Sequence, residues 1–172
     1  CIAKIIEPIG NNDYKPSVAR WNMATGEINP MPYEYPDLKK VRFIYAASAE
    51  HQLYVQCYTQ YDLMTICDFN GNLKCNIYGP KWVNEKTQTQ HYSLGVEFCG
   101  DKILALYSGG DHRTDAYYPT KFLVFDLNGN YLKTLETGYM ITDFCYDKEN
   151  NRLIINLNDE IQFAYLDLEG II

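Results

Sequence analysis

The segment Asp68-Phe69-Asn70-Gly71-Asn72-Leu73-Lys74 recurs as Asp126-Leu127-Asn128-Gly129-Asn130-Tyr131-Leu132-Lys133, so that a D-x-N-G-N pattern precedes Leu-Lys twice. Asn-Gly between apolar runs is a strong signal for a β-hairpin, because both residues tolerate a positive φ. A shorter copy is Asp167-Leu168-Glu169-Gly170, and a looser version runs from Trp21 to Glu27. The sequence therefore predicts four hairpin turns of one repeated kind.

The spacing of these turns indicates the architecture. Their glycines are Gly26, Gly71, Gly129 and Gly170, with separations of 45, 58 and 41 residues. Repeats of about 40 to 50 residues with several short strands each are typical of β-propeller blades. A polar turn followed by an apolar strand also recurs, at 50–55, 100–105 and 150–155. Because sustained helical periodicity is absent, an all-β array is favoured over alternating strands and helices.

The predicted fold is an all-β propeller segment of about three to four four-stranded antiparallel blades, forming a single partial domain. The blades are expected at about 1–36, 37–80, 81–138 and 139–172. The expected strands are 2–7, 18–23, 27–31, 42–47, 53–58, 63–68, 73–78, 92–98, 103–108, 121–126, 131–136, 140–146, 152–157 and 161–167. In this division the first blade lacks its innermost strand and the last blade its outermost. Since a closed ring needs at least four whole blades, we expect a piece of a longer propeller, or else association with a second copy.

Composition excludes some classes of partner. The 15 Lys and Arg against 22 Asp and Glu give a formal charge of −7, and basic clusters are lacking, so neither nucleic acid nor an anionic membrane surface is expected as a partner. No run of about 18 apolar residues exists, so no transmembrane segment is predicted. The six cysteines show no C-x-x-C spacing and are expected to be mostly buried thiols. A Cys67–Cys75 disulfide and a lipid on Cys1 are the alternatives.

The order of five sequence segments resembles that of a known protein family. The order is Ser17–Asn22, Val41–Ala46, Tyr58-Thr59-Gln60-Tyr61-Asp62-Leu63-Met64, Asp68-Phe69-Asn70-Gly71 and Gly79-Pro80. It is similar to the TolB-like six-bladed β-propellers of Bacteroidetes, of which this chain would cover the C-terminal half; NHL-repeat propellers resemble it more loosely. The resemblance implies an uncharacterised protein of the bacterial cell envelope, periplasmic or lipid-anchored in the outer membrane. It implies no substrate and no catalytic residue.

Two long connections mark the third blade as the candidate functional region. They are 79–91, which leads into that blade, and 107–119, within it, and both are expected on one rim. Long loops on a rigid scaffold often carry function, and Tyr and Trp suit sugar or peptide ligands. The candidate ligand-binding residues are Trp82, His91, Tyr107, Asp111, His112, Arg113 and Tyr117. The alternative is a solvated insertion held down by its own aromatic side chains.

We therefore expect a non-enzymatic binding propeller of the cell envelope, with an unknown glycan, peptide or protein as ligand. The alternative is a hydrolase- or lyase-type enzyme acting at the central face of the complete propeller. No cofactor is expected. Asp111, His112 and Asp115 offer possible metal ligands, but their spacing matches no established motif. No Ser lies in a G-x-S-x-G sequence, whereas pairing of Cys99 with His91 or His112 stays open.

Overall fold

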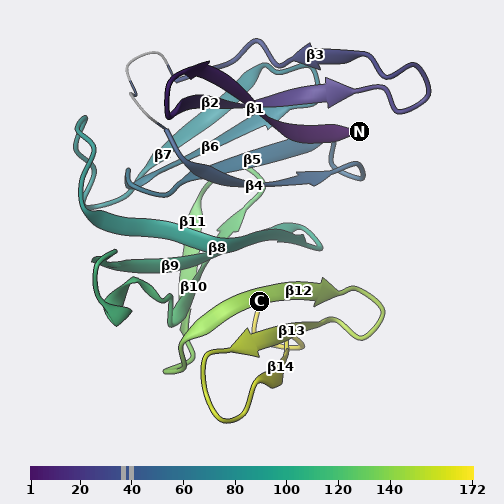
Figure 1. Cartoon of the computed structure of the whole chain (residues 1–172). Coiled ribbons are helices and arrows are strands. Elements are labelled where there is room, and N and C mark those ends of the chain that lie inside the picture. The colour runs from purple at the N-terminus through teal and green to yellow at the C-terminus, as the bar shows by residue number, and fades with distance from the viewer. Residues whose placement is uncertain (36–37, 39–40) are drawn as a thin grey trace.

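The computed structural model describes residues 1–35, 38 and 41–172, and these form four antiparallel sheets that follow one another in chain order (Figure 1). The first sheet contains β1 (Ile2–Gly10), β2 (Asp13–Trp21) and β3 (Ile28–Pro30). The second contains β4 (Phe43–Ser48), β5 (Leu53–Tyr58), β6 (Leu63–Asp68) and β7 (Leu73–Tyr78). The third contains β8 (Thr89–Cys99), β9 (Lys102–Asp111), β10 (Lys121–Asp126) and β11 (Tyr131–Glu136), and the fourth β12 (Ile141–Asp147), β13 (Arg152–Leu157) and β14 (Phe163–Asp167).

The predicted all-β propeller segment is confirmed. Each strand pairs with the next in sequence within its sheet, which is the meander of a propeller blade. One short 3₁₀ helix, η1 (Asp115–Tyr117), interrupts the connection from β9 to β10. None of the helices in the described part of the chain is long and apolar enough to cross a membrane.

The first hairpin is longer than the sequence predicted. β2 was expected from residue 18 but begins at Asp13, because β1 pairs with it from Ile2 opposite Arg20 to Gly10 opposite Asp13. The turn between them contains Asn12 with φ 60°, a conformation that asparagine tolerates better than most residues. The pair Asn11-Asn12 is thus a turn signal that the prediction overlooked.

Apolar side chains fill the spaces between successive sheets. β8 contacts both β4 and β12, so the first strands of the last three sheets form one inner surface. Val18, Phe43 and Leu63 belong to a cluster shared by the first two sheets. Val55 and Ile103 lie between the second and third sheets, and Phe122 and Leu153 between the third and fourth. Each sheet therefore buries apolar side chains against its neighbours.

The cysteines follow this packing only in part. All six are free thiols; Cys57, Cys67 and Cys99 are buried as expected. Cys145 was also expected inside, but it is exposed, because on β12 it points away from the face that buries Phe144. Cys67 lies opposite Leu73 at a bulge, one step out of register with Cys75, which lies opposite Ile66.

The repeated turns have nearly the same geometry. Asp68 Oδ1 accepts hydrogen bonds from the backbone N–H of Asn70 (2.8 Å) and of Asn72 (2.9 Å), while Oδ2 accepts one from Asn72 Nδ2 (2.8 Å). Asp126 makes the same three contacts with Asn128 and Asn130. Gly71 and Gly129 have φ of 83° and 86°. The D-x-N-G-N motif is therefore a turn stabilised by its own aspartate.

These contacts make stability depend on pH. The bonds from the Asn72 and Asn130 side chains, followed by the backbone donors, hold the pKa values of Asp68 and Asp126 below the usual range. A depressed pKa contributes stability above the unfolded-state pKa of about 3.9, and this contribution is lost as pH falls below it. Urea unfolding of wild type and Asp126→Asn at pH 7 and pH 3 is expected to show a smaller acid-induced loss in the variant. Asp115→Asn is the matched control, and an equal loss in all three proteins would contradict the assignment.

Candidate functional site

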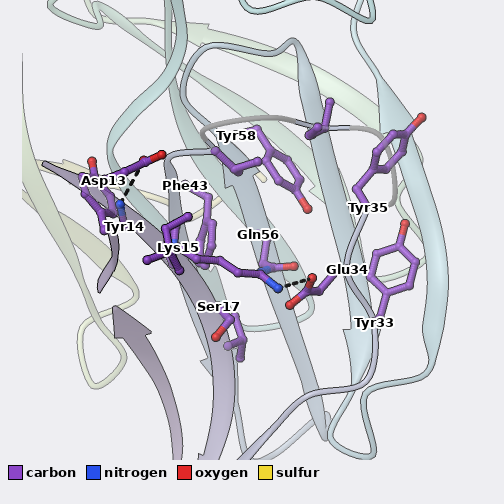
Figure 2. A pocket seen from close by; sticks show the side chains of 15 residues that line it. Asp13, Tyr14, Lys15, Ser17, Tyr33, Glu34, Tyr35, Phe43, Gln56 and Tyr58 are labelled. Atoms are coloured by element: carbon purple, nitrogen blue, oxygen red, sulfur yellow. Dashed lines mark hydrogen bonds and ion pairs between the residues drawn. The ribbon is translucent and has the colours of Figure 1, made fainter. Parts of the chain in front are cut away.

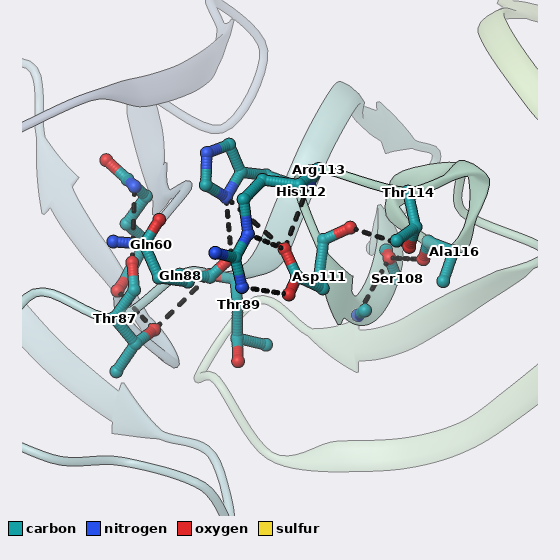
Figure 3. A network of polar contacts seen from close by, with 11 residues as sticks. Gln60, Thr87, Gln88, Thr89, Ser108, Asp111, His112, Arg113, Thr114 and Ala116 are labelled. Atoms are coloured by element: carbon teal, nitrogen blue, oxygen red, sulfur yellow. Dashed lines mark hydrogen bonds and ion pairs between the residues drawn. The ribbon is translucent and has the colours of Figure 1, made fainter.

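The two connections of the third blade lie side by side, as the sequence predicted (Figure 3). His112 N donates to Gln88 O at 3.2 Å, and His112 Nδ1 lies 2.9 Å from the same oxygen. Part of each connection is strand: Thr89 pairs with Asp111 and Gln90 with Gly110, so β8 and β9 extend into the segments expected to be loops.

The polar groups of this rim form hydrogen bonds and ion pairs with one another. Asp111 Oδ1 accepts the backbone N–H of Arg113 at 2.9 Å, and Asp111 Oδ2 accepts Arg113 Nη2 at 2.7 Å. The Arg113 contacts hold the pKa of Asp111 well below its usual range. Tyr117 stacks on Tyr118 with ring centroids 4.2 Å apart. These contacts stabilise the insertion, and ligand binding by Asp111, His112, Arg113 and Tyr117 stays a prediction.

Two of the expected rim residues are buried, so their placement on an exposed face was wrong. His91 is 2% exposed and Tyr107 8%. His91 Nδ1 lies 3.3 Å from the Tyr107 hydroxyl and 3.7 Å from Asp62 Oδ1. Burial lowers the pKa of His91, against the opposing effect of Asp62, and burial raises the pKa of Tyr107. Both side chains point between the second and third sheets, and His91 is neutral at neutral pH.

Trp82 lies in a different group from Asp111. Its ring centroid is 5.9 Å from that of Tyr35, 6.3 Å from Tyr61 and 5.0 Å from Tyr78. This aromatic cluster joins the connection after β3 to β7 and to the connection after β7. The structure therefore places Trp82 with the second sheet, separate from the rim of the third.

The motif that carried the family resemblance is a structural clamp. Asp62 is 1% exposed, and its Oδ2 accepts the backbone N–H of Lys81 at 2.9 Å. Gly79 N donates to the backbone oxygen of Asp62 at 2.8 Å. A Cβ on Gly79 would lie 2.2 Å from the Asp62 carboxylate. Asp62 and Gly79 can therefore pack this closely only because residue 79 has no side chain.

A cavity of about 350 Å³ lies between β2, the second sheet and described residues of the connection from β3 to β4, among them Tyr33–Tyr35 (Figure 2). A volume of 300 to 1,000 Å³ is typical of small-molecule sites, which are mostly apolar with a few well-placed polar groups. This cavity has five aromatic side chains in its wall, from Tyr14, Tyr33, Tyr35, Phe43 and Tyr58.

The polar groups of this cavity are few. Gln56 is 5% exposed, and its Oε1 is buried without a hydrogen-bond partner among the described residues. Lys15 Nζ and Glu34 Oε2 form an ion pair of 2.8 Å with side chains 49% and 50% exposed, so their charges offset each other at the cavity's edge. Asp13, whose Oδ1 accepts the backbone N–H of Tyr14, adds one further carboxylate to the lining. Because buried polar groups in native proteins are nearly always paired, the Gln56 oxygen indicates a missing donor.

The aromatic wall is fixed from behind. Asn76 Nδ2 on β7 donates to the Tyr33 hydroxyl at 3.0 Å, and Thr65 Oγ1 on β6 donates to Asn76 Oδ1 at 2.7 Å. Trp82 packs edge-on against Tyr35. The cavity is therefore preformed, and Trp82 contributes to it as a support for Tyr35.

This cavity was not predicted from the sequence. Gln56 lies in a strand whose six residues are all buried, where one polar residue attracts no attention. The other lining residues come from β1, β2, β4 and β5 and from the connection between β3 and β4. The one available signal was Tyr33-Glu34-Tyr35, two aromatic residues around a charge in a segment between strands.

Comparison with known proteins gives a fold and no family. No family model matches the sequence, and no curated protein matches it. A protein of unknown function from Bacteroides caccae superposes with a TM-score of 0.55 at 16% identity, over 88% of this chain and 50% of its own. A member of the DUF4221 family from Bacteroides vulgatus gives 0.58 at 14% identity, over 86% and 53%. A chain of the nidogen/laminin complex gives 0.60 at 12% identity, over 88% and 52%.

These matches support a propeller-like fold. At such identities they show the fold alone, so the narrower resemblance to TolB-like propellers stays a prediction. The chain spans about half the length of the solved structures it matches.

Proposed function

We propose that this protein is a non-enzymatic binding propeller whose tyrosine-lined cavity holds one sugar ring of a glycan. The observation that carries the proposal is Gln56, a buried amide in the cavity wall whose oxygen has no donor among the described residues. A ligand hydroxyl would supply that donor. Of the ligand classes considered from the sequence, a glycan fits these groups better than a peptide or a protein.

The chemistry of the wall supports this choice. A sugar ring has apolar C–H faces that pack on aromatic rings, and hydroxyl groups at its edge that form hydrogen bonds. Tyrosine provides both a rigid apolar face and a polar tip. Since the charges of Lys15 and Glu34 offset each other and Asp13 adds one further carboxylate, the lining has no excess positive charge, and the cavity favours an uncharged ring. The two tethered tyrosines Tyr33 and Tyr35 reduce the ordering that binding requires.

Replacing Gln56 by methionine separates binding from folding. The side chain keeps its length and loses the unpartnered oxygen, so we expect the free energy of unfolding to stay equal or rise by about 1 kcal/mol. Affinity for the sugar is expected to fall about tenfold, which corresponds to about 1.4 kcal/mol. Urea unfolding and isothermal titration calorimetry with hexosides measure the two effects.

The matched control is Gln162→Met, because Gln162 is exposed and outside the cavity. It is expected to leave affinity unchanged. If Gln56→Met destabilises the protein and leaves hexoside affinity as in wild type, then Gln56 serves the core and the proposal fails.

We also propose an envelope location for the complete protein, as the family resemblance implies. The Tyr58–Asp62 and Gly79-Pro80 motif supports it, and two of the structural neighbours come from Bacteroides. Cell fractionation with an antibody against this chain tests it, and recovery in the cytoplasm alone would contradict it.

A further inference from the structure

A second cavity adjoins the first. Tyr14, Pro16 and Phe43 line both, so the two cavities meet at these three residues. The second cavity has a volume of about 550 Å³ and is bordered by the inner strands β4 and β8. Unlike the first, it carries a net positive charge, from Lys4 and Arg42.

The two cations have no carboxylate partner in the described part of the chain. Arg42 Nε donates to the Tyr14 hydroxyl at 2.9 Å, and Lys4 Nζ donates to the backbone oxygen of Phe43 at 2.7 Å. Each of these contacts leaves further N–H donors on its cation. In a protein with a net charge of −7, two neighbouring cations without a carboxylate partner are unusual, because acidic side chains outnumber basic ones.

A buried hydroxyl lies in the same wall. Ser93 is 2% exposed, and its Oγ has no hydrogen-bond partner among the described residues. It lies where β8 leaves the regular register, between Tyr92 and Val96, and the next residue, Leu94, has φ 68°. A positive φ in a residue with a branched side chain is costly and concentrates at functional positions. The bulge places a Ser donor and the exposed Leu94 in the wall of a cavity that contains two cations.

We infer that the two cavities form one site for an anionic sugar, with the ring in the tyrosine-lined cavity and an oxyanion against Arg42, Lys4 and Ser93. This inference rests on the proposed function and narrows its ligand class. The Tyr14 hydroxyl joins the halves, because it lines the first cavity while it accepts from Arg42 in the second. The Arg42 guanidinium, the Lys4 ammonium and the Ser93 hydroxyl are hydrogen-bond donors. A carboxylate, phosphate or sulfate group can accept hydrogen bonds from all three.

Arg42 is the better residue to change. Lys4 also lines a third cavity together with Glu97 of β8 and Asp143 of β12, and a change at Lys4 would remove the one cation of that lining. Burial and the charge of Asp143 raise the pKa of Glu97. Arg42 does not border that third cavity, so its replacement changes the oxyanion position and the one contact with Tyr14.

The test compares matched ligands by isothermal titration calorimetry at low salt. The probes are methyl hexosides of the gluco, galacto and manno series, the corresponding methyl hexuronides, and the hexose 6-phosphates. Wild type is expected to bind one acidic sugar at least about tenfold more tightly than its neutral partner, since hydrogen bonds to a charged group are stronger than those to a neutral one. Arg42→Gln is expected to abolish this preference, so that the acidic sugar and its neutral partner bind the variant with equal affinity. Arg113→Gln is the matched control and is expected to keep the preference.

The outcomes separate the two proposals. If neutral and acidic sugars bind wild type equally well, the anionic site is wrong and the proposed function stands. If no sugar of the panel binds, the proposed function itself fails. Tighter binding of the uronide supports the inference with a carboxylate, and tighter binding of the phosphate supports it with a phosphoryl group. An acidic preference that survives Arg42→Gln overturns it.

Discussion

Replacing Phe122 by alanine is expected to lower the free energy of unfolding by about 3 to 5 kcal/mol, because large-to-small changes of fully buried aromatic residues leave a cavity. Phe122 is 0% exposed and packs edge-to-face against Phe144, with ring centroids 4.9 Å apart. Phe144 in turn lies against Gly95 of β8, where an added Cβ would come within 2.7 Å of its ring. The change therefore weakens the contact between the third and fourth sheets.

Urea unfolding measures the loss, and hydrogen exchange locates it. Protection is expected to fall in β8–β14 more than in β4–β7, because each blade packs mainly on its neighbours. Phe163→Ala is the matched control; Phe163 is 68% exposed on β14, so a change within about 0.5 kcal/mol is expected. Equal destabilisation by the two variants would show that the packing of Phe122 is not decisive.

Replacing Gly79 by alanine is expected to cost about 3 kcal/mol, at the upper end of the range for overpacking. The new Cβ would lie 2.2 Å from the Asp62 carboxylate, which is buried and held by Lys81 N at 2.9 Å. To make room for the new methyl group, the carboxylate would have to move away from that donor and from His91, whose Nδ1 lies 3.7 Å from Asp62 Oδ1. The hydrogen bond between Asp62, directly before β6, and Lys81 in the connection after β7 would then be lost.

Gly10→Ala is the matched control for this change. A Cβ at Gly10 meets nothing within 4 Å, and its φ does not lie in the left-handed region, so the substitution is expected to leave stability within about 0.5 kcal/mol of wild type. Thermal unfolding of the two variants side by side measures the difference. A Gly79→Ala protein as stable as Gly10→Ala would show that the Asp62 clamp contributes little.

The strands were predictable because their signals are local. In the second sheet β5, β6 and β7 have the bounds that the sequence predicted, since the turn at Asp68–Asn72 sets both neighbouring strands. The errors were local as well. β2 begins five residues early because the Asn12 turn was overlooked, and β8 and β9 extend into the expected loops because Thr89 and Asp111 pair.

The candidate site was predictable only in part. The spacing of the long connections was sufficient to place 79–91 beside 107–119, because neighbouring loops of a meander share a rim. It was not sufficient to tell which side chains face outward. His91 and Tyr107 point into the space between two sheets, and whether a position in a strand faces solvent depends on what the next blade places against it.

The sequence by itself determined the repeat, the hairpins and the all-β class, because a turn such as Asp126–Asn130 depends on hydrogen bonds and φ angles within five consecutive residues. Only the tertiary structure decided where a ligand fits. Tyr14, Phe43 and Gln56 are separated along the chain and meet because two sheets pack at a particular angle and distance. A cavity is the space that such packing leaves unfilled, and no local preference of the backbone encodes it.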